Sequence, residues 1–129
     1  MNTCIIGIGS NIDAERNIAE ALQLIGKSCT ILQTSTMLKT KPIGYTAQSD
    51  FTNGAVKIET NLSQEELNLY LKDVEDQLGR DRTQHKYGPR TIDLDLMVWN
   101  GQLIDQDYYT RDFLRQSAAE LGFHASNKE

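Results

Sequence analysis

The chain has 129 residues, a net charge of −5, and 39% hydrophobic residues. A chain of this length buries roughly two-thirds of its unfolded surface, so we expect one domain spanning residues 1–129. The acidic charge argues against general nucleic-acid binding, because affinity for a polyanion depends on a basic surface. The sequence contains neither a signal-peptide pattern nor an apolar run that could span a bilayer, so we expect a cytoplasmic protein that does not contact membranes.

The first half of the chain predicts a strand, a helix and two more strands. Residues 4–8 are apolar and read as a strand ending at 9–11. Apolar residues then recur at helical spacing, with Asp13 as the expected N-cap and Gly26 as the stop. Residues 29–40, rich in Thr and Ile, predict a second strand, 42–50 a loop, and 51–60 a half-buried strand.

The second half predicts another helix and another strand. A Ser-x-x-Glu capping box at 63–66 begins a helix that ends at Gly79. After a basic segment at 80–90, apolar residues alternate with other residues from Ile92 to Trp99, which predicts a strand. This order matches an α+β fold, the ferredoxin-like βαββαβ antiparallel sheet with helices on one face. Beyond about residue 105 the pattern predicts a short helix at 112–121.

Two carboxylates, Asp93 and Asp95, lie two residues apart on the last predicted strand. Residues i and i+2 of a strand face the same way about 6.5 Å apart, so this pair could hold one hard cation or bridge two. Alone, Asp-x-Asp is typical of the solvated face of a strand. The basic segment beside it adds guanidinium groups, which bind phosphate oxygens bidentately. Together they predict a nucleoside triphosphate with magnesium.

Other known motifs are missing from the sequence. There is no G-x-x-x-x-G-K-[ST] segment, and the segment Gly7-Ile8-Gly9-Ser10-Asn11-Ile12 lacks the third glycine of a dinucleotide fingerprint. We interpret it as a tight strand-to-helix turn that lets another group approach the backbone. Neither histidine has a partner at metal-ligand spacing and Ser10 has no evident base, which argues against zinc and acyl-transfer chemistry.

Five motifs, taken in order, resemble the 6-hydroxymethyl-7,8-dihydropterin pyrophosphokinase family of folate biosynthesis. The resemblance extends to about residue 104, and its Gly-Pro-Arg-Thr-x-Asp-x-Asp segment is highly specific. The motifs are Gly7-Ile8-Gly9-Ser10-Asn11, Thr40-Lys41-Pro42-Ile43-Gly44, Asp50-Phe51-Thr52-Asn53, Gly79-Arg80-Asp81-Arg82 and Tyr87-Gly88-Pro89-Arg90-Thr91-Ile92-Asp93-Leu94-Asp95.

The resemblance implies a reaction and a set of residues for it. The terminal diphosphate of ATP, the co-substrate, would pass to the hydroxymethyl group of the pterin with release of AMP, assisted by two Mg²⁺ ions. The implied catalytic residues are Arg80, Arg90, Asp93 and Asp95, and the two aspartates are the implied metal ligands. The implied ATP-binding residues are Glu75, Arg82, Tyr87, Leu96 and Thr110. The implied pterin-binding residues are Thr40, Ile43, Phe51 and Asn53, with the Asn53 carboxamide on the pterin edge and the Phe51 ring stacked on it. We expect a monomer with no nucleic-acid partner.

The chain departs from this family from about residue 105. The family usually continues with Pro-His, then Arg-x-Phe, then a longer apolar tail, whereas this chain reads Thr110-Arg111-Asp112-Phe113-Leu114-Arg115. Phe113 then takes the place of the histidine and the later arginine has no clear counterpart. Under another alignment, Phe123 supplies a second pterin-stacking ring. The divergence leaves open a non-catalytic or weakly active pterin- or nucleotide-binding paralogue, and a ferredoxin-like RNA-binding module is disfavoured by the acidic charge.

Overall fold

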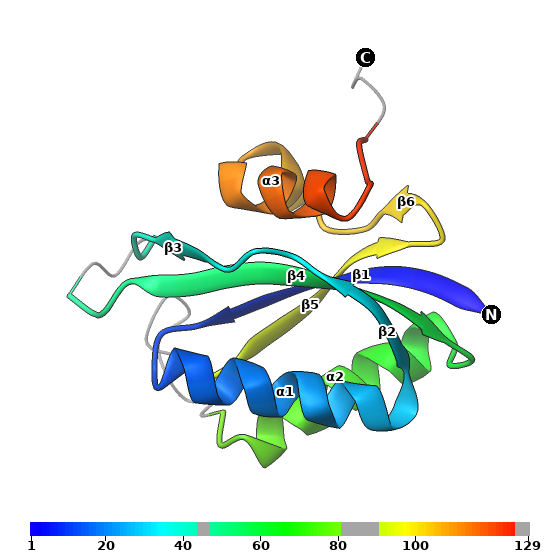
Figure 1. The fold of residues 1–129 in the computed structure, drawn as a ribbon, viewed down its shortest axis with the longest axis horizontal. Helices are drawn as coiled ribbons and strands as arrows, with labels where there is room; N and C mark the ends of the chain where they lie inside the picture. Colours follow the sequence, from blue (N-terminus) through cyan, green and yellow to red (C-terminus); the bar gives the residue numbers. More distant parts are fainter. Residues whose placement is uncertain (44–46, 81–90, 126–129) are drawn as a thin grey trace.

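The computed structural model describes residues 1–43, 47–80 and 91–125. Six strands form one antiparallel sheet with the order β2-β4-β1-β5-β6, and β3 also pairs with β4 (Figure 1). In chain order the elements are β1 (Asn2–Ser10), α1 (Ala14–Ser28), β2 (Thr30–Thr34), β3 (Leu38–Thr40), β4 (Phe51–Thr60), α2 (Gln64–Gln77), β5 (Asp93–Trp99), β6 (Gln102–Leu103), the 3₁₀ helix η1 (Gln106–Tyr109) and α3 (Asp112–Glu120). The predicted ferredoxin-like α+β fold is confirmed.

The sheet has a core on each of its faces. Cys4, Ile6 and Ile8 of β1 point to the face covered by α1 and α2, whereas Ile5 points to the face covered by α3. Successive strand residues alternate between faces, so β1 contributes to both cores. In Figure 1, α1 and α2 lie together below the sheet and α3 lies above it. The two helices of the βαββαβ unit therefore share one face, as predicted, and α3 adds a layer on the other.

The stretch predicted as one strand at 29–40 is two strands. The chain leaves the ladder at 35–37, where the Ser35 hydroxyl accepts a hydrogen bond from the Ala55 N–H at 2.8 Å. Met37 packs directly on Gly54, because a Cβ added to Gly54 would lie 2.4 Å from the Met37 sulfur. The break lets β3 return to the start of β4, which places Thr40 opposite Phe51.

The predicted alternation along β5 is correct through Leu96 and wrong after it. Ile5 pairs with Val98 and Ile6 with Leu96, so Met97 is an extra residue in a β-bulge. Met97 and Val98 are consequently both buried in the α3 core, while Trp99 packs against the other core. The bulge gives α3 two apolar anchors close to the carboxylate pair.

Helix ends follow local sequence with two exceptions. The predicted capping box is present: Ser63 Oγ accepts from the Glu66 N–H at 3.1 Å, and Glu66 Oε1 accepts from the Ser63 N–H at 2.8 Å. Asp13 precedes α1 as predicted, but with a φ of 42° and no side-chain cap. The helix also continues past Gly26 to Ser28. None of the helices in the described residues is long and apolar enough to cross a membrane.

The Cys4 thiol makes the stability of the fold vary with pH in the alkaline range. Burial, and secondarily the nearby Cys29, raises the pKa of Cys4 from 9.0 to about 11. The folded protein therefore keeps this proton at pH values where the unfolded chain loses it, so the free energy of unfolding falls as pH rises from about 9 to about 11. Urea unfolding across this range should show a shallower decline for Cys4→Ala than for the wild type. Equal declines would contradict the assignment.

Candidate active site

A cavity of about 200 Å³ lies where β1 ends and β4 and β5 begin. Residues from η1 and α3 close it on the side away from α1 and α2. About 300 Å³ is the lower end for pockets that hold drug-sized molecules, so this cavity suits a small ligand. Its lining residues are Gly9, Thr40, Lys41, Ile43, Phe51, Asn53, Asp93, Asp95, Asp107, Arg111 and Phe113.

Gly9 forms the floor of the cavity. It pairs with Asn53 on one neighbouring strand and with Asp93 on the other, so all three lie in one row across the sheet. A Cβ on Gly9 would lie 2.6 Å from Asn53 Oδ1, closer than atoms can approach. We predicted that residues 7–12 form the strand-to-helix turn. This is wrong for Gly7 to Ser10, which belong to β1, because the connection to α1 lies at residues 11–13. The predicted close approach to the backbone is present, and the group that approaches is the Asn53 amide.

The Asn53 carboxamide is held by Thr40. Asn53 Nδ2 donates to Thr40 Oγ1 at 2.6 Å. A carboxamide has two N–H donors and an acceptor oxygen, so this bond leaves one donor and the oxygen to face a ligand. Asn53 thus presents a donor and an acceptor side by side at the cavity wall.

Asp93 and Asp95 both line the cavity, as their spacing predicts. Burial, followed by the neighbouring Asp93, raises the pKa of the Asp95 carboxyl from 3.8 to about 8. By its accessible surface Asp95 is exposed within the open cavity, so the surrounding protein lowers its hydration only in part. Two carboxylates that repel each other here would be stabilised by a cation.

The donor set fits Mg²⁺. Among the described residues, no group of three or more His, Cys, Asp or Glu side chains is arranged to hold a metal ion. Mg²⁺ is usually held by one or two carboxylates, with substrate phosphates and water as the other ligands. The pair Asp93 and Asp95, open to a cavity, meets that requirement.

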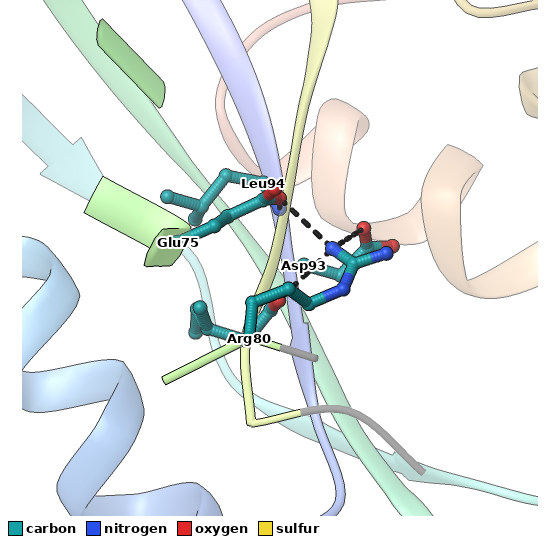
Figure 2. A network of polar contacts seen from close by, with 5 residues as sticks. Glu75, Arg80, Asp93 and Leu94 are labelled. Atoms are coloured by element: carbon teal, nitrogen blue, oxygen red, sulfur yellow. Dashed lines mark hydrogen bonds and ion pairs between the residues drawn. The ribbon is translucent and has the colours of Figure 1, made fainter. Parts of the chain in front are cut away.

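Arg80 reaches Asp93 from behind the cavity. Its Nη1 lies 3.1 Å from Asp93 Oδ1, 3.2 Å from the Ile92 carbonyl oxygen and 3.2 Å from Glu75 Oε2 (Figure 2). Glu75 Oε2 also accepts from the Leu94 N–H at 2.7 Å. The predicted catalytic arginine is therefore attached to the strand that carries the carboxylate pair.

The sequence did not lead us to predict that residues of η1 and α3 form a wall of the cavity. Asp107, Arg111 and Phe113 line the cavity, and Arg111 Nη1 lies 3.7 Å from Asp107 Oδ2. Asp105 lines an adjoining hollow, and burial raises the pKa of its carboxyl. The signal was present as the Arg-x-Phe spacing of Arg111 and Phe113, which we passed over by placing Phe113 on the family histidine.

The structure brings together most of the predicted residues that it describes. Six line the cavity: Thr40, Ile43, Phe51, Asn53, Asp93 and Asp95. Glu75 and Leu96 are buried, with 4% and 6% of their surface exposed, and Thr110 is exposed at the end of η1. Phe123 packs in the α3 core, 5.7 Å from the Tyr108 ring between centroids, which removes it as a cavity ring. Arg82, Tyr87 and Arg90 lie outside the described residues.

The fold and the cavity define a class of protein. It is a ferredoxin-like domain with a cavity that a carboxamide and a carboxylate pair line from neighbouring strands. The comparison with known proteins then identifies the family within that class.

The family model for 7,8-dihydro-6-hydroxymethylpterin-pyrophosphokinase matches residues 5–122. The 2-amino-4-hydroxy-6-hydroxymethyldihydropteridine pyrophosphokinase of Bacillus subtilis is 37% identical over 93% of this chain and 78% of its own length. The enzyme of the same name from Haemophilus influenzae is 34% identical over 85% of this chain and 70% of its own length. The bifunctional protein FolKE of Lactococcus lactis subsp. cremoris is 37% identical over 83% of this chain and 31% of its own length.

The chain belongs to the 7,8-dihydro-6-hydroxymethylpterin-pyrophosphokinase family. The predicted family, and with it an enzyme of the diphosphokinase type in folate biosynthesis, is confirmed. The match reaches residue 122, so it includes the segment from 105 onward in which we expected divergence.

Gly9→Ala tests the floor of the cavity. The new Cβ would displace the Asn53 amide, which lies at the end of a side chain that can rotate, so the protein should fold normally. Losing the paired hydrogen bonds should weaken binding of the hydroxymethyl pterin by roughly tenfold or more, measured by calorimetry. In Gly7→Ala the nearest neighbour of the Cβ lies at 3.6 Å, so a smaller effect is expected. Unchanged pterin affinity in Gly9→Ala would refute this account of Asn53.

Proposed function

We propose that the chain transfers diphosphate from ATP to 6-hydroxymethyl-7,8-dihydropterin and releases AMP. The observation that carries this proposal is the row Asn53, Gly9 and Asp93, which sets a heterocycle-binding amide and a cation-binding carboxylate on either side of one bare glycine. A pterin bound to Asn53 would lie in the same cavity as the two carboxylates, and its hydroxymethyl group would extend toward them. Family membership supplies the identity of the two substrates.

The pterin is proposed to bind between the sheet and α3. Asn53 would pair with the edge of the ring system, with Thr40 holding the amide in place. Phe51 from β4 and Phe113 from α3 would offer aromatic faces from the two sides of the cavity. Ile43 would close the slot from the loop after β3.

The phosphates are proposed to bind at the carboxylate pair. Asp93 and Asp95 would hold two Mg²⁺ ions, which when bound neutralise charge on the transferring phosphates. Arg80 and Arg90 would position the diphosphate. Arg80 supports this role by its place beside Asp93, whereas Arg90 is proposed from its sequence match.

The residues proposed to bind ATP are supported partly by sequence matches and partly by their places in the structure. Arg82, Tyr87 and Thr110 are proposed from their sequence matches, and Arg111 is added because it lines the cavity next to Phe113. The Leu96 side chain is buried, so its contact with ATP would be made by its backbone. The Glu75 side chain is also buried, and its contribution to ATP binding would pass through Arg80.

In the proposed reaction the hydroxymethyl oxygen attacks the β-phosphorus of ATP. A bond from that oxygen to the β-phosphorus forms, and its hydroxyl proton is released to solvent. The bond from the β-phosphorus to the oxygen bridging to the α-phosphate breaks, which releases AMP. The protein's residues orient the two substrates and meet the charge on the phosphates, so no covalent enzyme intermediate is required. We further propose one domain over residues 1–129, a monomer and a cytoplasmic location.

An assay of AMP release with ATP, Mg²⁺ and the hydroxymethyl pterin tests the proposed function directly. Production of AMP that depends on all three components is expected. Measurable pterin binding with AMP at background would instead establish the non-catalytic paralogue. Direct comparison with the Bacillus enzyme, which covers the same region, provides a positive control.

Asp95→Asn should separate function from stability. AMP release is expected to fall to background, because a carboxamide is a much weaker Mg²⁺ ligand than a carboxylate. The melting temperature in EDTA should be equal to or higher than that of the wild type, because the substitution removes a poorly hydrated carboxylate that repels Asp93. Scanning calorimetry and the AMP assay measure both effects. Wild-type AMP release in this variant would disprove the metal assignment.

Phe113→Leu and Phe123→Leu form a matched pair that identifies the ring on the pterin. Phe113 lines the cavity, so its loss should raise the KM for pterin about threefold to tenfold with little change in melting temperature. Phe123 packs on Tyr108, so its loss should lower the melting temperature and leave that KM unchanged. The reverse pattern would restore the alignment that assigns Phe123 to the site.

A further inference from the structure

The network behind the cavity centres on a buried carboxylate. Glu75 lies in the last turn of α2 with 4% of its surface exposed, and it does not line the cavity. A buried charge is stable only when it is paired and hydrogen-bonded. Glu75 meets both conditions, because Oε2 accepts from the Leu94 N–H at 2.7 Å and lies 3.2 Å from Arg80 Nη1.

Glu75 also holds Arg80 through the backbone. The Arg80 N–H donates to the Glu75 carbonyl at 3.0 Å, and the Gly79 N–H donates to the Asp76 carbonyl at 3.1 Å. With Gly79 at a φ of 84°, these bonds form a Schellman motif that ends α2. The residue that precedes the basic segment is therefore fixed to Glu75 by its main chain and by its side chain.

The hydrogen bond from the Leu94 N–H to Glu75 satisfies a backbone donor at the edge of β5. On one side β5 pairs with β1, and on the other the described residues of β6 pair only with Val98 and Trp99. Within the part of the chain that the structure describes, no strand neighbours the Leu94 N–H, and the Glu75 carboxylate takes the place of a strand acceptor. Leu94 lies between the two carboxylates, so this bond helps to fix the backbone that carries both.

Arg80 is shared between two carboxylates. Its Nη1 lies 3.2 Å from Glu75 Oε2 and 3.1 Å from Asp93 Oδ1, and Figure 2 shows the guanidinium between them. Without the Glu75 charge, the guanidinium would pair more fully with Asp93, and that pairing competes with a cation for the same oxygen. The negative charge of Glu75 therefore draws the guanidinium partly away from Asp93.

We propose that Glu75 is a positioning residue that divides Arg80 between itself and Asp93, and so sets the Mg²⁺ requirement of the site. The expected change in Mg²⁺ requirement rests on the proposed function. The contacts of Glu75 with Arg80 and Leu94 are properties of the protein without substrates. Outer partners of metal ligands typically change metal affinity or activity about 10–100-fold when they are replaced.

Glu75→Gln removes the charge and keeps an oxygen for the Leu94 N–H. We expect the Mg²⁺ concentration for half-maximal AMP release to rise on the order of tenfold, with the KM for pterin unchanged. Asp73→Asn, which removes an exposed charge from the same helix, is the matched control and should behave as the wild type. When Arg80 is already replaced by Ala, adding Glu75→Gln should not raise this Mg²⁺ concentration further, because Glu75 acts through Arg80. A wild-type Mg²⁺ requirement in Glu75→Gln, or an equal loss in both backgrounds, would overturn the proposal.

Two measurements without turnover separate this proposal from the proposed function. Hydrogen exchange at the Leu94 amide should stay slow in Glu75→Gln and become faster in Glu75→Ala. Calorimetric titration with Mg²⁺ and the α,β-methylene analogue of ATP should show the same weakening in Glu75→Gln as the kinetic assay. If the wild type releases no AMP, the proposed function fails while these readouts still decide the role of Glu75. Fast exchange at Leu94 in the wild type would refute the contact itself.

Discussion

The site depends on the absence of side chains from the middle strand of the sheet. Gly7 and Gly9 lie on the same face of β1 as Ile5, and that is the face α3 covers. Met97 and Leu114 pack over Gly7, whereas Gly9 lies open to the cavity. At Gly9 the constraint is strict, because the Asn53 amide occupies the position that a Cβ would need. One glycine thus brings the Asn53 amide and the Asp93 carboxylate to the same row of the sheet.

The electrostatics of the site oppose its stability. Asp93 and Asp95 lie together on the wall of the cavity, where partial burial and then the Asp93 charge raise the pKa of Asp95 to about 8, although Asp95 keeps an exposed surface. Arg80 offsets part of this repulsion, but it is divided between Asp93 and the buried Glu75. Functional sites commonly retain such unfavourable arrangements because a bound ligand relieves them. The remaining structure compensates with two cores, one on each face of the sheet.

The sequence predicted the elements near the site better than the site's far wall. β4 begins and ends where its alternation indicates, and the capping box at Ser63 is present, because both depend on neighbours within a few residues. The sequence did not predict the bulge at Met97. A bulge sets two residues of β5 opposite one residue of β1, and this pairing leaves no pattern in the sequence of β5 itself. Arg111 and Phe113 were misplaced for a related reason. Their position depends on how α3 docks on the sheet, which involves residues far apart in the chain.

By itself, the sequence determined the family, the order of elements and the residues from Thr40 to Asp95 that line one side of the cavity. These follow from motifs whose spacing is set within a single strand or turn. Tertiary structure alone decided that Gly9 stands between Asn53 and Asp93, that Phe113 and not Phe123 lines the cavity, and that Glu75 holds Arg80 against β5. Each of these depends on strand register or helix docking, because such contacts join residues whose separation along the chain carries no periodic signal.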